Sequence, residues 1–204
     1  MTKTISRLYN SHYEARAAVR ELESAGVEHG DISILASNAD SSYDEKTKTF
    51  PDRDLDGKDD RAEAARTGAG VGAMAGGAAG LLAGLGLIAI PGVGPIVAAG
   101  WLAATLTGVA AGAATGGVVG ALTQAGVSPD EADVYAEALR RGGAVVSARV
   151  NDHDVSRVQA LLDQSSVNIS ERATAYRASG WKGFDPSTPP YTSDEVARER
   201  ELYR

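Results

Sequence analysis

One stretch of this chain has no charged side chain. No Asp, Glu, Lys or Arg occurs between Arg66 and Asp130. Within that stretch glycine recurs every fourth residue in two registers, namely Gly68, Gly72, Gly76, Gly80 and Gly84, then Gly100, Gly108, Gly112, Gly116 and Gly120. A glycine in a water-exposed helix costs about 1 kcal/mol relative to Ala, so a helix with this spacing needs close contact with another backbone. The pattern predicts helix packing at these glycines.

The uncharged stretch predicts two helices that fold back on each other. Gly68–Ile90 and Ile96–Leu122 are separated by Pro91–Pro95, a Pro- and Gly-rich break. Two helices joined by so short a connection form an antiparallel hairpin. At about 1.5 Å per residue, each is long enough to cross a hydrocarbon core of about 30 Å. Since neither helix has a charged face, we expect the hairpin to insert into a lipid bilayer.

Basic residues near the ends of the hairpin predict its orientation. Arg53, Lys58, Arg61 and Arg66 precede it, and Arg140 and Arg141 follow it. The turn carries no basic residue, so the positive-inside tendency predicts a membrane protein with both termini in the cytoplasm. Glycine stripes also favour a homo-oligomer. The same spacing suits two alternatives: a soluble, cytoplasmic scaffold whose hairpins bundle into an oligomer core, and a hairpin that lies on the membrane surface.

The flanking segments predict an α/β unit on each side of the hairpin. Residues 3–36 show a strand–helix–strand pattern, in which Ser11 and Glu14 form a capping box. After Ser128 and Glu131, which form a second capping box around Pro129, the pattern returns with strands at 144–150 and 167–173. Two such halves can share one antiparallel sheet. The predicted class is therefore α+β, a ferredoxin-like split β-α-β sandwich interrupted by a long Gly/Ala-rich antiparallel helical hairpin.

This interpretation divides the chain into four parts. Residues 3–36 and 128–173 form the discontinuous ferredoxin-like domain, residues 37–66 an acidic flexible linker, residues 67–127 the glycine-zipper hairpin, and residues 174–204 a C-terminal tail with a short charged helix near 195–203. A long insertion between the two halves is tolerable, because an insertion whose ends lie close together adds little loop entropy.

The linker contains a calcium-loop pattern. Its spacing fits D-x-D-x-D-G-x5-E, with candidate ligands at Asp52, Asp54, Asp56, Lys58 (through its carbonyl), Asp60 and Glu63. Alternating carboxylates around a glycine turn suit a hard cation such as Ca2+. However, Asp59 stands where such loops carry an apolar residue, and no good helix precedes the loop. A solvated acidic linker, neutralised locally by its Arg and Lys residues, is the alternative.

Composition argues against several other functions. The net charge of -7 lacks the basic cluster that nucleic acid requires. Without cysteine, the chain has no disulfide, thiolate nucleophile or cysteine-bound metal. His12, His29 and His153 are far apart in sequence, and no nucleophile has a recognisable base nearby. We therefore expect neither an enzyme nor a small-molecule substrate, and no cofactor beyond the possible Ca2+.

Three motifs carry a likeness to a known family. They are DGKDDRA at 56–62, IAIPGVGP at 88–95 and ERATAYRASGWKGFD at 171–185. In these motifs the chain resembles the bacterial general stress protein 17M-like family (heat-induced stress protein type), over most of residues 3–185. The resemblance implies a small α/β domain interrupted by a Gly-Ala hairpin and a stress-associated, non-enzymatic role at or near the membrane. It brings no substrate and no catalytic residue.

Overall fold

The computed structural model describes residues 2–40, 86–110 and 117–203. The fold is α+β, with a five-stranded antiparallel sheet. Its strands are β1 (Thr2–Tyr9), β2 (Ile32–Ser37), β3 (Gly86–Ile90), β4 (Gly94–Gly100) and β5 (Ala144–Asn151). Its helices are α1 (His12–Ser24), α4 (Trp101–Ala110), α5 (Gly117–Gln124), α6 (Pro129–Arg140), α7 (Val155–Asp163), α8 (Ile169–Ala178) and α9 (Ser193–Glu201).

The strands lie in the order β1-β5-β2-β4-β3. The middle strand of the five is β2, and β5 beside it pairs with β1 on one side and with β2 on the other. Both predicted halves therefore contribute to one sheet. The hairpin of β3 and β4 extends it, because β4 pairs with β2. These last two strands come from residues 67–127, so part of that segment belongs to the sheet.

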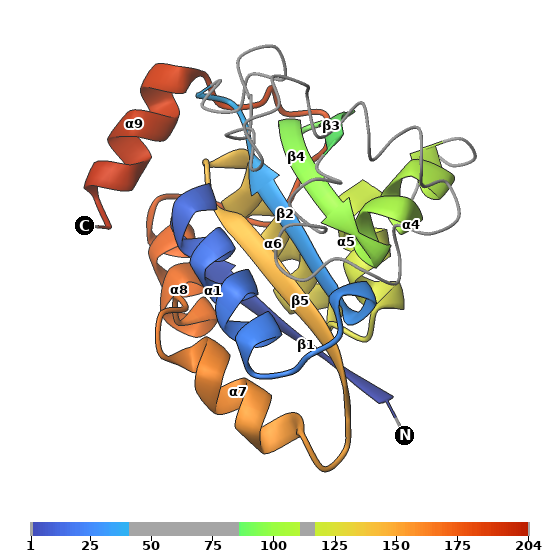
Figure 1. The fold of residues 1–204 in the computed structure, drawn as a ribbon. Helices are drawn as coiled ribbons and strands as arrows, with labels where there is room; N and C mark the ends of the chain where they lie inside the picture. Colours follow the sequence, from blue (N-terminus) through green and yellow to red (C-terminus); the bar gives the residue numbers. More distant parts are fainter. Residues whose placement is uncertain (1, 41–85, 111–116, 204) are drawn as a thin grey trace, which may run out of the picture.

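Helices cover both faces of the sheet (Figure 1). On one face, Ala18, Val19 and Leu22 of α1 and Val158 and Leu162 of α7 pack on the apolar side chains of β1, β2 and β5. On the other face, α4, α5, α6 and α8 enclose a second core. Successive side chains of a strand point to opposite faces, so each central strand supplies both cores. The serine half of both predicted capping boxes is confirmed: Ser11 accepts a hydrogen bond from Glu14 N, and Ser128 from Glu131 N. The glutamate side chains accept from other donors, Glu14 from Asn10 N and Glu131 from the Ser128 hydroxyl.

The predicted helical hairpin is wrong around its turn. Gly86–Ile90 and Gly94–Gly100 are strands, joined at Pro91–Val93. Ile88 and Ile90 on one side of the turn, and Ile96 and Val97 on the other, are β-branched residues that suit strands. The turn requires glycine, because Gly92 has a φ of +74°. Helix is found further along, in α4 and α5.

Membrane insertion of this segment is contradicted. No helix within residues 2–40, 86–110 or 117–203 combines the length and apolar character needed to cross a bilayer. Where an uninterrupted helix was expected over Ile96–Leu122, residues 96–100 belong to strand β4, and helix is described over Trp101–Ala110 and Gly117–Gln124. The prediction of a transmembrane hairpin and of a membrane location with both termini cytoplasmic is therefore wrong for the described chain.

The last predicted strand is also wrong. Of residues 167–173, only Val167 makes a β-bridge, to Leu8. From Ile169 the chain is helical, since Asn168 caps α8 by accepting hydrogen bonds from Ser170 N and Glu171 N. Ala173 and Tyr176 of α8 then pack in the second core. The strand ends after one residue because a strong N-cap starts a helix there.

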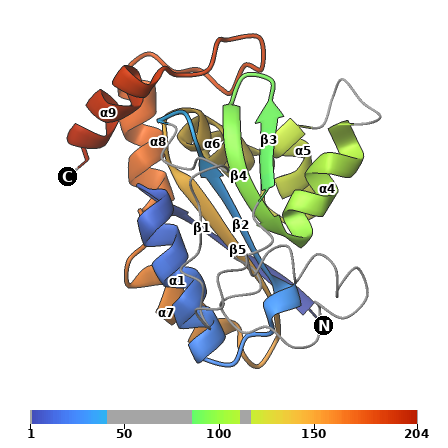
Figure 2. The same ribbon diagram turned by 45° about the horizontal axis from the view of Figure 1, so that its top comes forward.

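The C-terminal segment folds back across the molecule. Figure 2 shows the chain after α8 passing the end of the β3–β4 hairpin before it returns as α9. Pro186 and Pro190 lie so close to Gly92 and Gly94 that side chains at either glycine would clash. The short charged helix expected near the C-terminus is present as α9, capped by Thr192. Two of the motifs that carry the family likeness, 88–95 and 171–185, thus lie in segments that meet in space.

Several predicted site residues lie outside the described residues. These are the candidate Ca2+ ligands Asp52, Asp54, Asp56, Lys58, Asp60 and Glu63, and the zipper glycines Gly68, Gly72, Gly76, Gly80, Gly84, Gly112 and Gly116. Of the remaining zipper glycines, Gly108 lies in α4 and Gly120 in α5. Gly100 ends strand β4 with a φ of +85°, where a Cβ atom would overlap Ile32 O. Its role there is close approach of β4 to β2.

Candidate binding slot beside strand β1

Strand β1 forms one edge of the sheet and leaves part of that edge unpaired. Val167 N donates to Leu8 O from the outer side, and the Tyr135 hydroxyl reaches Ser6 O from the same side. Backbone groups alternate in direction along a strand, so the N–H and C=O groups of Thr4 also point outward. Among the described residues, Val167 is the one that pairs as a strand with this edge.

A hollow of about 470 Å³ lies along this edge, and we call it the β1 slot. Its walls come from three stretches of the chain that are remote in sequence, residues 4–7, 126–135 and 159–169. The residues that line it are Thr4–Arg7 of β1, Gly126 and Val127 before α6, Glu131 and Tyr135 of α6, Gln159 and Asp163 of α7, and the α7–α8 connection with the start of α8, 166–169. Helix α6 covers one face of the sheet and α7 the other, so the slot is bounded on both sides of β1.

A row of serines lies on the α6 side of the slot. Ser6 stands opposite Ser147, which stands opposite Ser33 on β2. The Ser6 and Ser147 hydroxyls are 2.8 Å apart, and the Ser33 hydroxyl donates to Ala99 O at 2.8 Å. All three are buried. Of the three, Ser6 lines the slot and forms its polar floor, and its hydroxyl is already bonded inside the sheet.

Tyr135 fixes the wall of the slot against its floor. Its hydroxyl donates to Ser6 O at 2.8 Å. Burial raises the pKa of Tyr135 well above its ordinary value, although the positive charge of Arg7 acts in the opposite direction. The phenol therefore remains protonated at neutral pH and keeps this hydrogen bond.

Arg7 and Asp163 close the α7 side. The Arg7 guanidinium donates to the Asp163 carboxylate and to Ser6 O. Burial lowers the pKa of Arg7, but the hydrogen bond and negative charge of Asp163 outweigh burial and raise it overall. The charges of Arg7 and Asp163 cancel each other. Among the residues that line the slot, Glu131 is then the charged residue that has no basic partner.

The chemistry of these walls suits binding. No His, Cys or Lys is among the described residues that line the slot. The hydroxyls of Ser6 and Tyr135 are engaged as described above. In residues 2–40, 86–110 and 117–203, no group of three or more metal-binding side chains comes together. What the slot offers instead is a strand edge on which Ser6 O is bonded by Tyr135 and Arg7, while the amide and carbonyl groups of Thr4 point outward, where another strand can pair with them.

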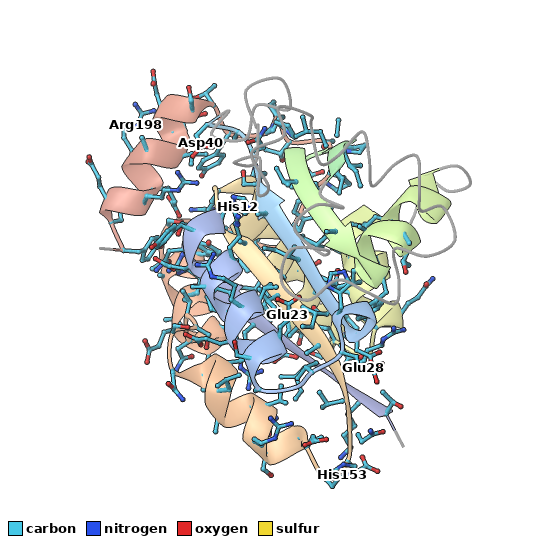
Figure 3. The ribbon with its side chains drawn as sticks, in the orientation of Figure 1. His12, Glu23, Glu28, Asp40, His153 and Arg198 are labelled. Carbon is cyan, nitrogen blue, oxygen red and sulfur yellow. The ribbon has the colours of Figure 1, made fainter. Side chains whose placement is uncertain are left out.

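The histidines do not form a site together. Figure 3 shows His12 at the start of α1 and His153, on the β5–α7 connection, at opposite ends of the molecule. His29 lies 3.2 Å from Glu23, and His153 lies 3.1 Å from Asp154. Both of these contacts are with residues close in sequence.

Glu131 is predictable from the sequence as a capping residue of α6, and in the structure it also lines the slot. Tyr135, Arg7, Gln159 and Asp163 were not singled out. The available signal for the slot was the Asn168-x-x-Glu171 capping pattern, which indicates that a helix replaces the fourth strand.

Comparisons with known proteins give no further guide: no family model matches the chain, and no curated protein or solved structure matches it.

Proposed function

We propose that this chain is a non-enzymatic binding module, in which a ferredoxin-like core accepts an extended polypeptide segment along β1. The observation that supports this proposal is that Val167 alone of its segment forms a β-bridge, to Leu8, and that a hollow continues from there along the edge of the sheet. In a split β-α-β sandwich a fourth strand would lie here. Addition of a strand to an exposed edge is a common mode of peptide recognition.

The register supports this place for a ligand. Val167 pairs with Leu8 in the antiparallel sense. Continued in that sense, residues 168–173 would have paired along β1 as far as Thr2, and the start of α8 removes them. A segment from another molecule could therefore extend the sheet without displacing a strand.

The walls of the slot favour binding of a single extended peptide over pairing with the sheet edge of a second molecule. Both α6 and α7 line the slot, so the β1 edge lies between two helices. An identical edge in a second copy would be flanked by the same helices, and two such edges would be kept apart. A peptide without covering structure meets no such obstacle.

Self-assembly into a scaffold is a second candidate, favoured by the opposite edge. Within residues 2–40, 86–110 and 117–203, strand β3 is the last strand on this side of the sheet, and its Leu87 is 42% exposed. An edge strand with an exposed large apolar side chain is suited to pairing with another chain. In this case the ligand is a strand of the same protein. The stress-associated role implied by the family resemblance remains a prediction for either candidate.

The test uses two substitutions at one position. Thr4→Pro removes the outward N–H of Thr4, a change that edge strands tolerate. Thr4→Val retains that N–H and serves as the control. The full chain is used to select heptapeptides from a random displayed library, and their binding to all three proteins is measured by fluorescence anisotropy, with circular dichroism to check folding.

Peptides that bind the original chain and Thr4→Val, but bind folded Thr4→Pro at least about tenfold more weakly, would support strand addition at β1. Equal binding to all three, or no selected peptide, would refute it. Sedimentation velocity distinguishes the second candidate: oligomers that persist in Thr4→Pro but dissociate in Leu87→Lys would place assembly at β3.

A further inference from the structure

We infer that the peptide taken up by the β1 slot runs antiparallel to β1 and places a cationic side chain, Lys or Arg, against Glu131. This inference rests on the proposed function and adds the chemistry of the ligand. It follows from the direction of pairing, from the alternation of side chains and from the charges that line the slot.

Direction comes from Val167. Val167 pairs with Leu8 in the antiparallel sense, at the end of the slot nearest the C-terminal end of β1. A ligand strand that continues this direction would pass Ser6, whose carbonyl oxygen stays bonded to Tyr135, and would pair with the outward backbone groups of Thr4. Since antiparallel strands align their hydrogen bonds best, the same sense is expected for the ligand.

Alternation fixes which wall each ligand residue faces. Ser6 points to the α6 side of the sheet, where it meets Ser147. Thr4 points to the same side, two residues away. Side chains directly opposite each other in a sheet share a face, so ligand residues opposite Thr4 and Ser6 would also point toward α6. Their neighbours would point toward α7.

The two walls differ in charge. On the α7 side, Asp163 is neutralised by Arg7. On the α6 side, Glu131 carries a negative charge and is held in place by the Ser128 hydroxyl, which donates to Glu131 Oε2 at 2.6 Å. That hydrogen bond engages one oxygen and orients the carboxylate. A cationic side chain on the α6 side of the ligand would complement this charge.

The remaining walls limit the size of the ligand. Gly126 and Val127 line the slot on the same side as Glu131, and Val167 and Ile169 line it at the end near Leu8. With about 470 Å³ available, the slot accommodates a few residues in extended form. We therefore expect small or β-branched residues around the cationic one.

The experiment uses acetylated and amidated heptapeptides of alternating Thr and Val, with Lys, Ala or Glu at the central position. Their binding to the full chain is measured by fluorescence anisotropy. The Lys peptide should bind about two- to fivefold more tightly than the Ala peptide, the range of an exposed ion pair, and the Glu peptide more weakly. The advantage of Lys should shrink as salt is added.

Glu131→Gln provides the decisive variant, and Gln159→Ala on the opposite wall is its control. Glu131→Gln should abolish the advantage of Lys over Ala, measured as the ratio of the two affinities within that variant, and Gln159→Ala should preserve that ratio. If the Ala peptide binds but Lys gains nothing, or the gain survives in Glu131→Gln, the charge inference is wrong and the slot still binds peptide. If no peptide binds, both this inference and the proposed function fail.

Discussion

Val196 packs its side chain directly onto the backbone of Gly142, with no room for a Cβ atom at position 142. Val196 is the fully buried apolar residue of α9, and Gly142 follows the end of α6. Arg200 adds a hydrogen bond to Gly142 O at 3.0 Å. The C-terminal helix is therefore held at the end of α6 by close packing as well as by polar contacts.

Gly142→Ala should release this contact. A residue other than glycine at a φ of +100° is strained by about 1–2 kcal/mol, and the new methyl group would also displace Val196. The control is Gly26→Ala, because Gly26 has a φ of +84° but open space around it. Urea unfolding should show a larger loss of unfolding free energy in Gly142→Ala than in Gly26→Ala. Trypsin should also cut Gly142→Ala near Arg198 faster than it cuts the control. Equal losses and equal cleavage would show that Val196 adapts freely.

An ionic cluster joins the same two helices. Glu137 is fully buried on α6 and accepts hydrogen bonds from Arg140 and Arg141. Arg141 also contacts Glu199 of α9 at 3.1 Å and lies over the ring of Tyr176, 4.2 Å from its centroid. Removal of the Glu137 charge would leave Arg140 without the carboxylate that it bonds and Arg141 with Glu199 alone.

Glu137→Gln should lower the free energy of unfolding by about 3–5 kcal/mol, as expected when one partner of a buried ion pair is removed. The control is Arg157→Gln, which breaks an ion pair with Asp154 of the same i,i+3 spacing at the surface. The control should show no change beyond experimental error. Guanidinium unfolding measures both. A similar, small effect of the two substitutions would mean that the cluster is relaxed by water.

The elements predicted well are those specified by local interactions. The helices after Ser11 and Ser128 have both capping residues within four positions, so their starts follow from the sequence. Strands β3 and β4 were missed because abundant Ala and Gly suggested a helical stripe, while the isoleucines at 88, 90 and 96 around a Pro-Gly turn indicated a hairpin of strands. The isoleucines and the Pro-Gly turn therefore predict the strands better than the four-residue glycine period does.

The slot could not have been predicted in the same way. Thr4, Tyr135 and Asp163 meet only because β5 inserts between β1 and β2, which brings α6 and α7 to opposite sides of one edge. No spacing in the sequence reports that arrangement. The related error, a strand over 167–173, arose because Val167 and Ile169 suggested a strand, whereas the side chain of Asn168 stabilises a helix.

Asn168→Ala should destabilise α8. The Asn168 side chain accepts from Ser170 N at 3.0 Å and Glu171 N at 3.2 Å, and loss of an N-cap costs about 1 kcal/mol. Asn168→Ser retains an acceptor oxygen without placing a second carboxylate against Glu171, and should be nearly neutral. Urea unfolding gives the free energies, and hydrogen exchange should show faster exchange of the Ser170 and Glu171 amides in the Ala variant. If both variants exchange alike, tertiary packing and not the cap defines the start of α8.

Alkaline pH should unfold the protein through its buried tyrosines. Burial raises the pKa of Tyr9, Tyr135 and Tyr176 well above the ordinary value of about 10. Above pH 10 the unfolded chain loses these protons and the folded chain keeps them. Their contribution to stability is thus complete below pH 10 and declines as the pH rises toward the raised values, with a limiting slope of about 4 kcal/mol per pH unit for three groups.

Tyr135→Phe separates this mechanism from general charge repulsion. It removes one of the three buried phenols, so the decline of unfolding free energy above pH 10 should become about one third less steep. At neutral pH the loss of its hydrogen bond to Ser6 O should cost about 0.5–1.5 kcal/mol. Tyr13→Phe, at a side chain that is 77% exposed, is the matched control and should leave the slope unchanged. Urea unfolding at successive pH values, followed by absorbance of tyrosinate, measures both. An unchanged slope in Tyr135→Phe would mean that this phenol ionises within the fold and would remove the reason for its fixed position on the wall of the slot.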